Sequence, residues 1–223
     1  MHLPSPVAAV IFDMDGTLLD TERLYRSAMF DVCRRMGVQM TDELHLSLIG
    51  APQEMGRQKL HAAFGADFDY ARFADAVHAD IDAASAAGVP LKPGAIDLLR
   101  FLKGRGVPTG LNTSTLRREA IRRLDRAGLS PLLDVVVTRS DVTQGKPHPE
   151  SYLAAARGLG AAPDLCVAVE DSHTGVRSAA AAGMATVLAP DLLAPTDEIA
   201  ALCIAVIKDL HVLHHHLARR LEA

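Results

Sequence analysis

Residues 7–22 read VAAVIFDMDGTLLDTE, and this stretch decides how the rest of the chain is interpreted. It opens with an apolar run containing β-branched side chains, the pattern of a strand that is buried on both faces. The run ends in two carboxylates one residue apart, Asp13 and Asp15, followed by glycine and threonine. A polar turn has a similar composition, but functional side chains in α/β proteins gather where parallel strands end. The stretch therefore predicts a buried strand that delivers two acidic groups to a site.

The composition indicates the class of protein. The chain has 223 residues, of which 49% are hydrophobic and 22% charged, as in an ordinary globular protein. Its net charge of −4 gives no general attraction to nucleic acids or anionic membranes. The three cysteines are far apart and lack metal-site spacing, and neither a secretory signal nor an apolar run of the ~18 residues of a membrane span is found. We therefore expect a cytoplasmic protein with no nucleic-acid or membrane partner, and take a monomer or weak dimer as the working expectation.

The periodicity of apolar residues changes along the chain. Residues 22–88 show helical periodicity and no convincing strand. From residue 89, apolar runs typical of strands alternate with amphipathic helices, which predicts βαβ units around a parallel sheet. The later strand candidates are residues 107–112, 134–138, 165–169, 185–188 and 203–207. We therefore expect an α/β fold, a doubly wound parallel sheet formed by residues 1–21 and 89–223, with an all-helical domain of residues 22–88 inserted in it.

Polar side chains follow four of the predicted strands. In chain order these residues are Asp13, Asp15 and Thr17; Thr113 and Ser114; Lys146; and Glu170 with Asp171. Because parallel strands end at one edge of a sheet, we expect these side chains to converge. Carboxylates without His or Cys suit a hard cation, Mg²⁺ above all, whereas hydroxyls, backbone N–H groups and a lysine suit phosphate oxygens. The set predicts a site where a carboxylate attacks a phosphate with the help of a metal ion.

These residues, in this order, resemble the four motifs of the haloacid dehalogenase superfamily. More narrowly, the chain resembles the β-phosphoglucomutase-like group, which has a helical cap inserted after the first motif. The segments GKPHPE at residues 145–150 and VEDSHTG at residues 169–175 are close to that group's motifs. The resemblance covers essentially the whole chain. It implies a Mg²⁺-dependent phosphatase for a small phosphorylated metabolite, with a sugar phosphate as the expected substrate.

The resemblance also implies a role for each residue of the first motif. Asp13 would be the nucleophile and a metal ligand, forming an aspartyl-phosphate. Asp15 would be the general acid and base, first protonating the leaving alcohol and then activating water, with its backbone carbonyl on the metal. Thr17, counted with the phosphate-binding residues, would support the flap that moves Asp15.

The later motifs would bind phosphate and metal. By the same resemblance, Thr113 and the Ser114 amide would hold the phosphoryl oxygens, and Lys146 would neutralise charge between the phosphate and the nucleophile. Asp171 would ligate Mg²⁺, with Glu170 as a second acidic ligand or as a residue that supports the ligands.

A sugar-phosphate mutase is the main alternative to a phosphatase. Mutases of the group hold the distal phosphate with a cap arginine, and Gln53 stands at that place here, directly after residues 50–52. A cap histidine of the mutases is replaced by Tyr25. Both differences favour hydrolysis, but Arg57 lies one helical turn after Gln53 and keeps the mutase open. Tyr25, Gln53 and Arg57 are therefore the cap residues expected to select the substrate.

Two other activities and a non-catalytic role are less favoured. The presence of Asp15 argues against dehalogenation. Phosphonate cleavage needs a lysine in a cap loop, whereas Lys59 falls in a predicted helix. A catalytically silent module that binds a phosphorylated ligand should have lost one of the motif carboxylates, and all of them are present.

The predicted helix after Ser114 carries an arginine-rich face. Because no aromatic residues are interleaved, we interpret this face as solvated rather than as a nucleic-acid interface. The arginines are Arg117, Arg118, Arg122, Arg123 and Arg126. The inward face of the same helix is expected to consist of Leu116, Ala120, Leu124 and Ala127.

Overall fold

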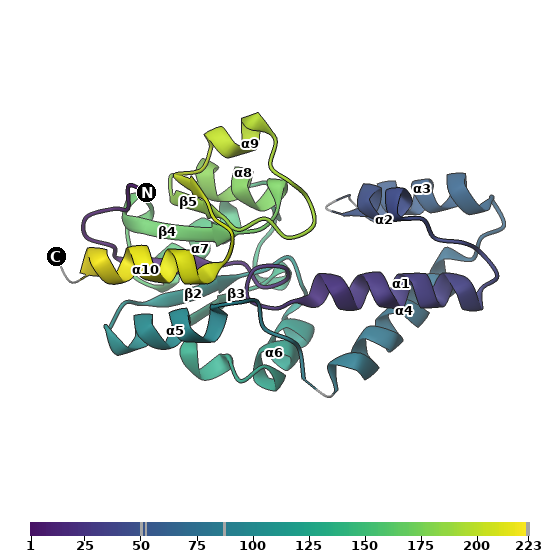
Figure 1. The fold of residues 1–223 in the computed structure, drawn as a ribbon, viewed down its shortest axis with the longest axis horizontal. Helices are drawn as coiled ribbons and strands as arrows, with labels where there is room; N and C mark the ends of the chain where they lie inside the picture. The colour runs from purple at the N-terminus through teal and green to yellow at the C-terminus, as the bar shows by residue number, and fades with distance from the viewer. Residues whose placement is uncertain (50, 52, 87, 222–223) are drawn as a thin grey trace. The chain divides into compact units, whose positions relative to one another are not determined.

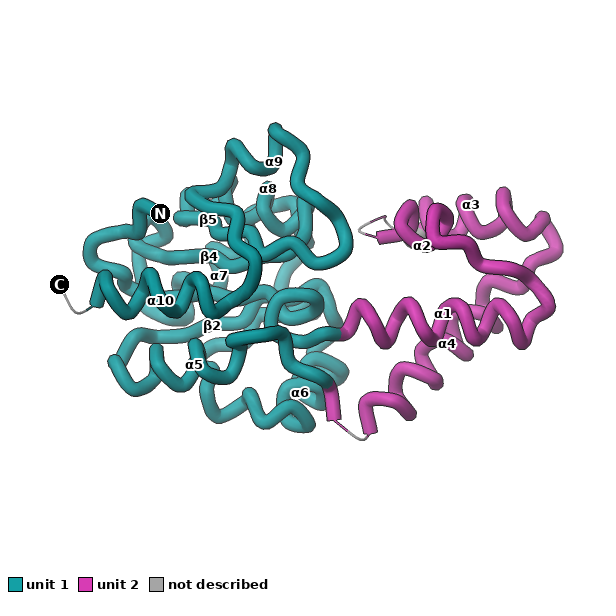
Figure 2. The backbone as a smooth tube through the Cα atoms, viewed as in Figure 1, with its two compact units in different colours: residues 1–20, 90–223 teal, residues 21–89 magenta. Residues whose placement is uncertain are grey.

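A computed structural model describes residues 1–49, 51, 53–86 and 88–221, with the side chain of Gln53 left outside the description (Figure 1). Gly50 and Pro52, part of the cap segment singled out above, also lie outside the described residues. The chain divides into two compact units, one of residues 1–20 with 90–223 and one of residues 21–89 (Figure 2).

The first unit is built on a six-stranded parallel sheet. Its strands are β1 (Ala9–Phe12), β2 (Thr109–Asn112), β3 (Val135–Val137), β4 (Cys166–Glu170), β5 (Ala185–Leu188) and β6 (Ala205–Val206). They are ordered β3-β2-β1-β4-β5-β6, so the winding direction reverses beside β1. Such a reversal leaves a crevice at the carboxyl ends of the central strands, where α/β proteins bind ligands. The expected doubly wound parallel sheet is confirmed.

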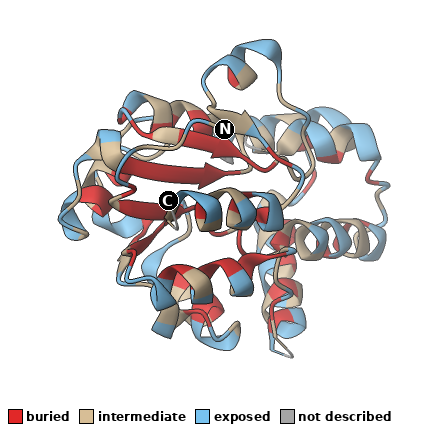
Figure 3. Ribbon diagram, turned by 60° about the vertical axis from the view of Figure 1, so that its left-hand side comes forward, coloured by how far each residue is buried: buried red, intermediate tan, exposed pale blue. Residues whose placement is uncertain are grey.

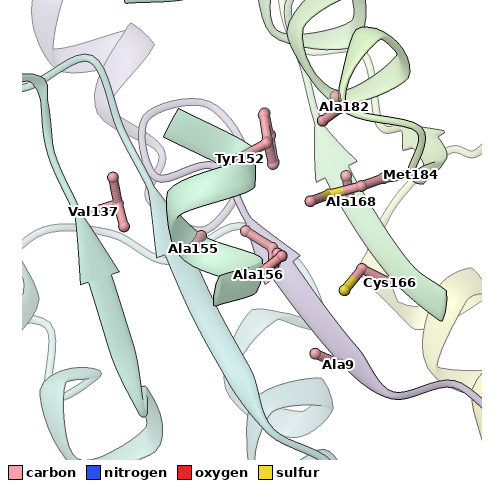
Figure 4. Packing of buried hydrophobic residues seen from close by; sticks show 11 residues of the cluster. Ala9, Val137, Tyr152, Ala155, Ala156, Cys166, Ala168, Ala182 and Met184 are labelled. Carbon is pink, nitrogen blue, oxygen red and sulfur yellow. The ribbon is translucent and has the colours of Figure 1, made fainter. Parts of the chain in front are cut away.

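Helices cover both faces of this sheet. Those of the first unit are α5 (Ala95–Gly104), α6 (Arg117–Arg126), α7 (Glu150–Gly158), α8 (His173–Ala181), α9 (Asp197–Ala201) and α10 (Leu210–Leu221). On one face, Tyr152, Ala155 and Ala156 of α7 pack with Ala9 and Ala168 of the central strands (Figure 4). Because alanine has a small side chain, the helix backbone lies close to the sheet. The strands are largely buried and the outer helix faces exposed (Figure 3).

The second unit is helical over its described residues. It comprises α1 (Thr21–Arg35), α2 (Asp42–Leu48), α3 (Gln53–Phe64) and α4 (Tyr70–Ser85). The apolar faces of α1 and α4 pack together through Ala28, Val32, Phe73, Val77 and Ile81. These positions recur at helical spacing, which explains why the periodicity predicted helices here.

None of the described helices has both the length and the apolar character needed to cross a membrane. The cytoplasmic location stays a prediction from the sequence.

Candidate active site

Lys146 joins the ends of three strands. Its Nζ donates to Asp13 Oδ1 after β1 and to Glu170 Oε1 at the end of β4, both at 2.6 Å, and to the carbonyl of Asn112 on β2 at 3.1 Å. The Lys146 side chain is only 6% exposed. Of the side chains expected to converge, Asp13, Lys146 and Glu170 are in direct contact in the fold.

Burial dominates the electrostatics of this cluster. It raises the pKa of Asp13 well above its ordinary value, and the nearby Lys146 charge opposes this without cancelling it. Burial alone would lower the pKa of Lys146, but the charges of Asp13 and Glu170 outweigh it and hold that pKa above its ordinary value. Lys146 is thus a permanent cation, and a second cation beside Asp13 would further favour its ionised form.

The carboxylate of Glu170 is fully buried and held from several sides. Tyr152 Oη donates to Oε1 at 2.8 Å, and Ser172 Oγ donates to Oε2 at 3.0 Å. Burial and the Glu170 charge raise the pKa of Tyr152 well above its ordinary value, so the phenol stays a donor. Ser172 also caps α8 by accepting from Gly175 N at 3.1 Å, which places the carboxylate at a helix N-terminus, where negative charge is favoured.

Three carboxylates form a group suited to a cation. Asp13, Glu170 and Asp171 each offer an oxygen atom, and these atoms all lie within 4.8 Å of one another. Gly16 has a φ of 86°, and a Cβ at this position would overlap Asp171 Oδ2. Glycine therefore permits the close approach of Asp171, and the all-oxygen donor set fits a hard divalent ion.

The Asp15 carboxylate has different partners. Arg123 Nη1 donates to Oδ1 at 2.7 Å and Thr115 Oγ1 donates to Oδ2 at 2.8 Å. Arg123 is 2% exposed and also bonds Glu119. The interpretation of Arg123 as part of a solvated face was therefore wrong.

Helix spacing contained the missed signal. Arg123 follows Ala120 by three residues and so shares its inward face. Leu116, expected to point inward, is instead 62% exposed, because it is the N-cap residue with extended backbone, outside the helical periodicity. Thr115 was also missed, although it directly follows Ser114.

The predicted phosphate-binding residues differ in exposure. Thr113 is buried and its Oγ1 accepts from Thr115 N at 3.0 Å, whereas Ser114 is exposed. Thr17 is buried, and its Oγ1 has no hydrogen-bond partner among the described residues. The side-chain amide of Asn112 likewise has no hydrogen-bond partner for its Oδ1 or Nδ2 among the described residues. This edge of the sheet thus carries hydrogen-bonding groups that the described protein atoms leave unsatisfied.

The cap residues belong to the second unit. Tyr25 lines a cavity of about 190 Å³ together with Glu22, Met29, His45, Leu48 and Ile49. Arg57 is exposed and its Nη2 donates to Glu54 of its own helix at 2.7 Å. Gln53 begins α3, with its side chain outside the described part. The role of these three residues in selecting a substrate stays a prediction.

The chain belongs to the haloacid dehalogenase-like hydrolases, a family that it matches over residues 7–183. The resemblance seen in the four motifs is thereby confirmed.

Named relatives narrow the class further. The chain is 38% identical over 176 residues to the phosphorylated carbohydrates phosphatase of Thermotoga maritima, covering 79% of this chain and 82% of that protein. It is 38% identical over 174 residues to hexitol phosphatase A of Escherichia coli K12, covering 78% of each. Among solved structures, a putative β-phosphoglucomutase from Thermotoga maritima matches with a TM-score of 0.80 at 33% identity, covering 94% of this chain and 98% of that one. The phosphorylated carbohydrates phosphatase and hexitol phosphatase A are phosphoric monoester hydrolases, whereas the putative β-phosphoglucomutase is named as a mutase.

Proposed function

We propose that this protein is a Mg²⁺-dependent phosphatase that hydrolyses a small phosphorylated metabolite of the sugar-phosphate class. The observation that carries the proposal is the Asp13 carboxylate, bonded to Lys146 and grouped with two further carboxylates suited to a cation. Relatives named as carbohydrate and hexitol phosphatases support the substrate class.

In the first half-reaction, Asp13 attacks phosphorus and forms an O–P bond as the ester O–P bond breaks. Asp15 gives its proton to the leaving oxygen. Thr113 and the Ser114 amide hold the phosphoryl oxygens, and Lys146 offsets the negative charge between Asp13 and the phosphate. Thr17, counted with these phosphate-binding residues, supports the flap that moves Asp15.

In the second half-reaction, Asp15 takes a proton from a water molecule that attacks phosphorus. The bond between phosphorus and Asp13 breaks, which releases phosphate, restores the Asp13 carboxylate and leaves Asp15 protonated for the next turnover. Asp13, Asp171 and the backbone carbonyl of Asp15 would hold Mg²⁺, with Glu170 as a further ligand or as a support for the ligands. The bound ion would reduce the repulsion between the Asp13 carboxylate and the phosphate.

Residues 21–89 serve as a cap that excludes bulk water during turnover. Tyr25, Gln53 and Arg57 are its substrate-selecting residues in this proposal. The working assembly is a monomer or weak dimer.

The decisive experiment measures phosphate release from p-nitrophenyl phosphate and from a panel of hexose and hexitol phosphates, with Mg²⁺ and with EDTA. The wild-type protein should be active with Mg²⁺ and lose its activity in EDTA. Asp13→Asn should remove turnover, by a factor of about 10⁴ or more. An inactive wild type, or an unimpaired Asp13→Asn, would reject the proposal.

A second candidate is a sugar-phosphate mutase, favoured by the similarity to a putative β-phosphoglucomutase. Incubation with a hexose 1-phosphate and catalytic bisphosphate separates the two candidates. A phosphatase releases phosphate faster than it forms the 6-phosphate, and a mutase does the reverse.

A further inference from the structure

Arg123 is a buried, charged side chain that has no role in the two half-reactions proposed above. It lies on the inward face of α6, beside Ala120 and Leu124, which are both fully buried. Its helix neighbours Arg118 and Arg126 are exposed. An arginine at such a position needs paired anions, because an unpaired buried charge is strongly unfavourable.

Two anions surround the guanidinium. Nη1 donates to Asp15 Oδ1 at 2.7 Å, and Nη2 donates to Glu119 one helical turn earlier. Glu119 is thus placed to fix the guanidinium on its own helix, while Nη1 donates to the proposed acid/base.

Asp15 is held at both of its oxygens by one segment of the chain. Thr115 Oγ1 bonds Oδ2 while Arg123 bonds Oδ1, and both residues follow β2. Two contacts on opposite oxygens restrict rotation of the carboxyl group. A leaving-group oxygen can replace the neutral Thr115 contact while the charged Arg123 contact keeps the orientation.

Stability alone does not account for this arrangement. Replacing a whole buried ion pair by apolar residues of similar volume is often neutral or stabilising, so packing between Ala120 and Leu124 does not by itself require an arginine. The arginine is therefore better explained by what it does to Asp15.

We propose that Arg123 is a positioning residue that, with Thr115, orients the Asp15 carboxyl group for proton transfer to the leaving oxygen. This inference rests on the proposed phosphatase function. Its consequence depends on the leaving group: an alkoxide needs the proton, whereas p-nitrophenolate departs without it.

The experiment compares kcat/KM for a hexitol phosphate and for p-nitrophenyl phosphate in full-length Arg123→Met, Thr115→Val and wild type with Mg²⁺. This constant reports the steps up to release of the leaving group. We expect Arg123→Met to lower it about 100-fold for the alkyl ester and less than about threefold for the aryl ester. Thr115→Val should show the same preference at smaller amplitude. The matched control is Arg118→Met, on the exposed side of the same helix. It should leave kcat/KM unchanged for both the hexitol phosphate and p-nitrophenyl phosphate.

The outcomes separate the two proposals. Equal losses on both esters, or no loss on either, would overturn the role of Arg123 while leaving the phosphatase intact. A wild type that hydrolyses neither ester would overturn the phosphatase and this inference with it. If Arg123→Met does not fold, Thr115→Val provides the test, because Thr115 is partly exposed and valine has a similar volume. The selective loss on the alkyl ester is then still required of Thr115→Val.

Discussion

Gly175 lies in the first turn of α8, directly against the carboxylate of Glu170. A Cβ at this position would overlap the carboxyl carbon and both carboxyl oxygens of Glu170. This carboxylate cannot move aside easily, because it is buried and bonded to Lys146 and Tyr152. We expect Gly175→Ala to lower the free energy of unfolding by about 1–3 kcal/mol and to weaken Mg²⁺-dependent activity. Urea unfolding and a Mg²⁺ titration of activity measure the two effects.

Gly104 provides the matched control. It is a helical glycine of α5, and a Cβ there would meet nothing within 4 Å. Gly104→Ala should be neutral or stabilising by up to about 1 kcal/mol, because alanine has the higher helix propensity. Equal destabilisation of the two variants would contradict the steric explanation.

His45 gives the helical unit a pH dependence. It is 3% exposed, packs near the Phe30 ring, and has its pKa lowered from the ordinary 6.5 by burial and by the Arg26 charge, partly offset by Asp42. The unfolded chain therefore binds a proton more readily than the folded one. Stability contributed by the neutral ring is present above pH 6.5 and is lost as the pH falls below that value towards the folded pKa.

The free energy of unfolding lost on acidification should be at most about 1.4 kcal/mol for each unit by which the pKa of His45 is lowered. Acidification from about pH 7.5 to about pH 5.5 should reduce the Tm of the wild type more than that of His45→Gln, which has no titrating ring. His78→Gln, on the exposed side of α4, is the control and should follow the wild type. A wild type and His45→Gln with the same pH dependence would refute this linkage.

At the scale of elements, the N-terminus of α8 combines a structural and a site function. Ser172 Oγ accepts from Gly175 N and donates to Glu170, whereas Thr196 caps α9 by accepting from Ile199 N at 3.3 Å. Ser172→Ala and Thr196→Ala should each cost about 1 kcal/mol in urea unfolding. Ser172→Ala alone should raise the Mg²⁺ concentration for half-maximal activity, by about tenfold, because it releases Glu170. A similar shift in Thr196→Ala would show that the effect is not local.

The sequence predicted these elements to different degrees. β5 was predicted at its exact bounds, because a short apolar run between a glycine and a proline is a clear strand signal. Ser172 and Glu170 lie close in sequence, so their contribution to one site was visible as a motif. The Arg123–Asp15 pair joins residues 108 positions apart, and the Tyr152 phenol reaches Glu170 across 18 positions. Pairings of this kind depend on tertiary packing, which periodicity does not encode.

At the scale of the whole molecule, the insertion of residues 21–89 leaves the sheet uninterrupted. β1 precedes the insertion and the other five strands follow it, so every strand pairing lies within the first unit. The chain leaves and re-enters this unit at adjacent points: Asp20 N donates to the Pro90 carbonyl at 2.8 Å, and Lys92 N donates to the Leu18 carbonyl at 2.9 Å. These bonds hold the two ends together independently of the helices between them.

We therefore expect a variant in which residues 21–89 are replaced by a Gly-Ser linker of about four residues to fold, because a loop of that length closes the ends. Circular dichroism should show retained helix and strand, and urea unfolding should remain cooperative. In our proposal the missing unit selects the substrate, so kcat/KM should fall by about 100-fold on sugar phosphates and much less on p-nitrophenyl phosphate. The Asp13→Asn form of the same variant shows whether any remaining turnover uses the same carboxylate. A variant that is unfolded would mean that the first unit needs the helical unit for its stability, and equal losses on both esters would mean that residues 21–89 do not select the substrate.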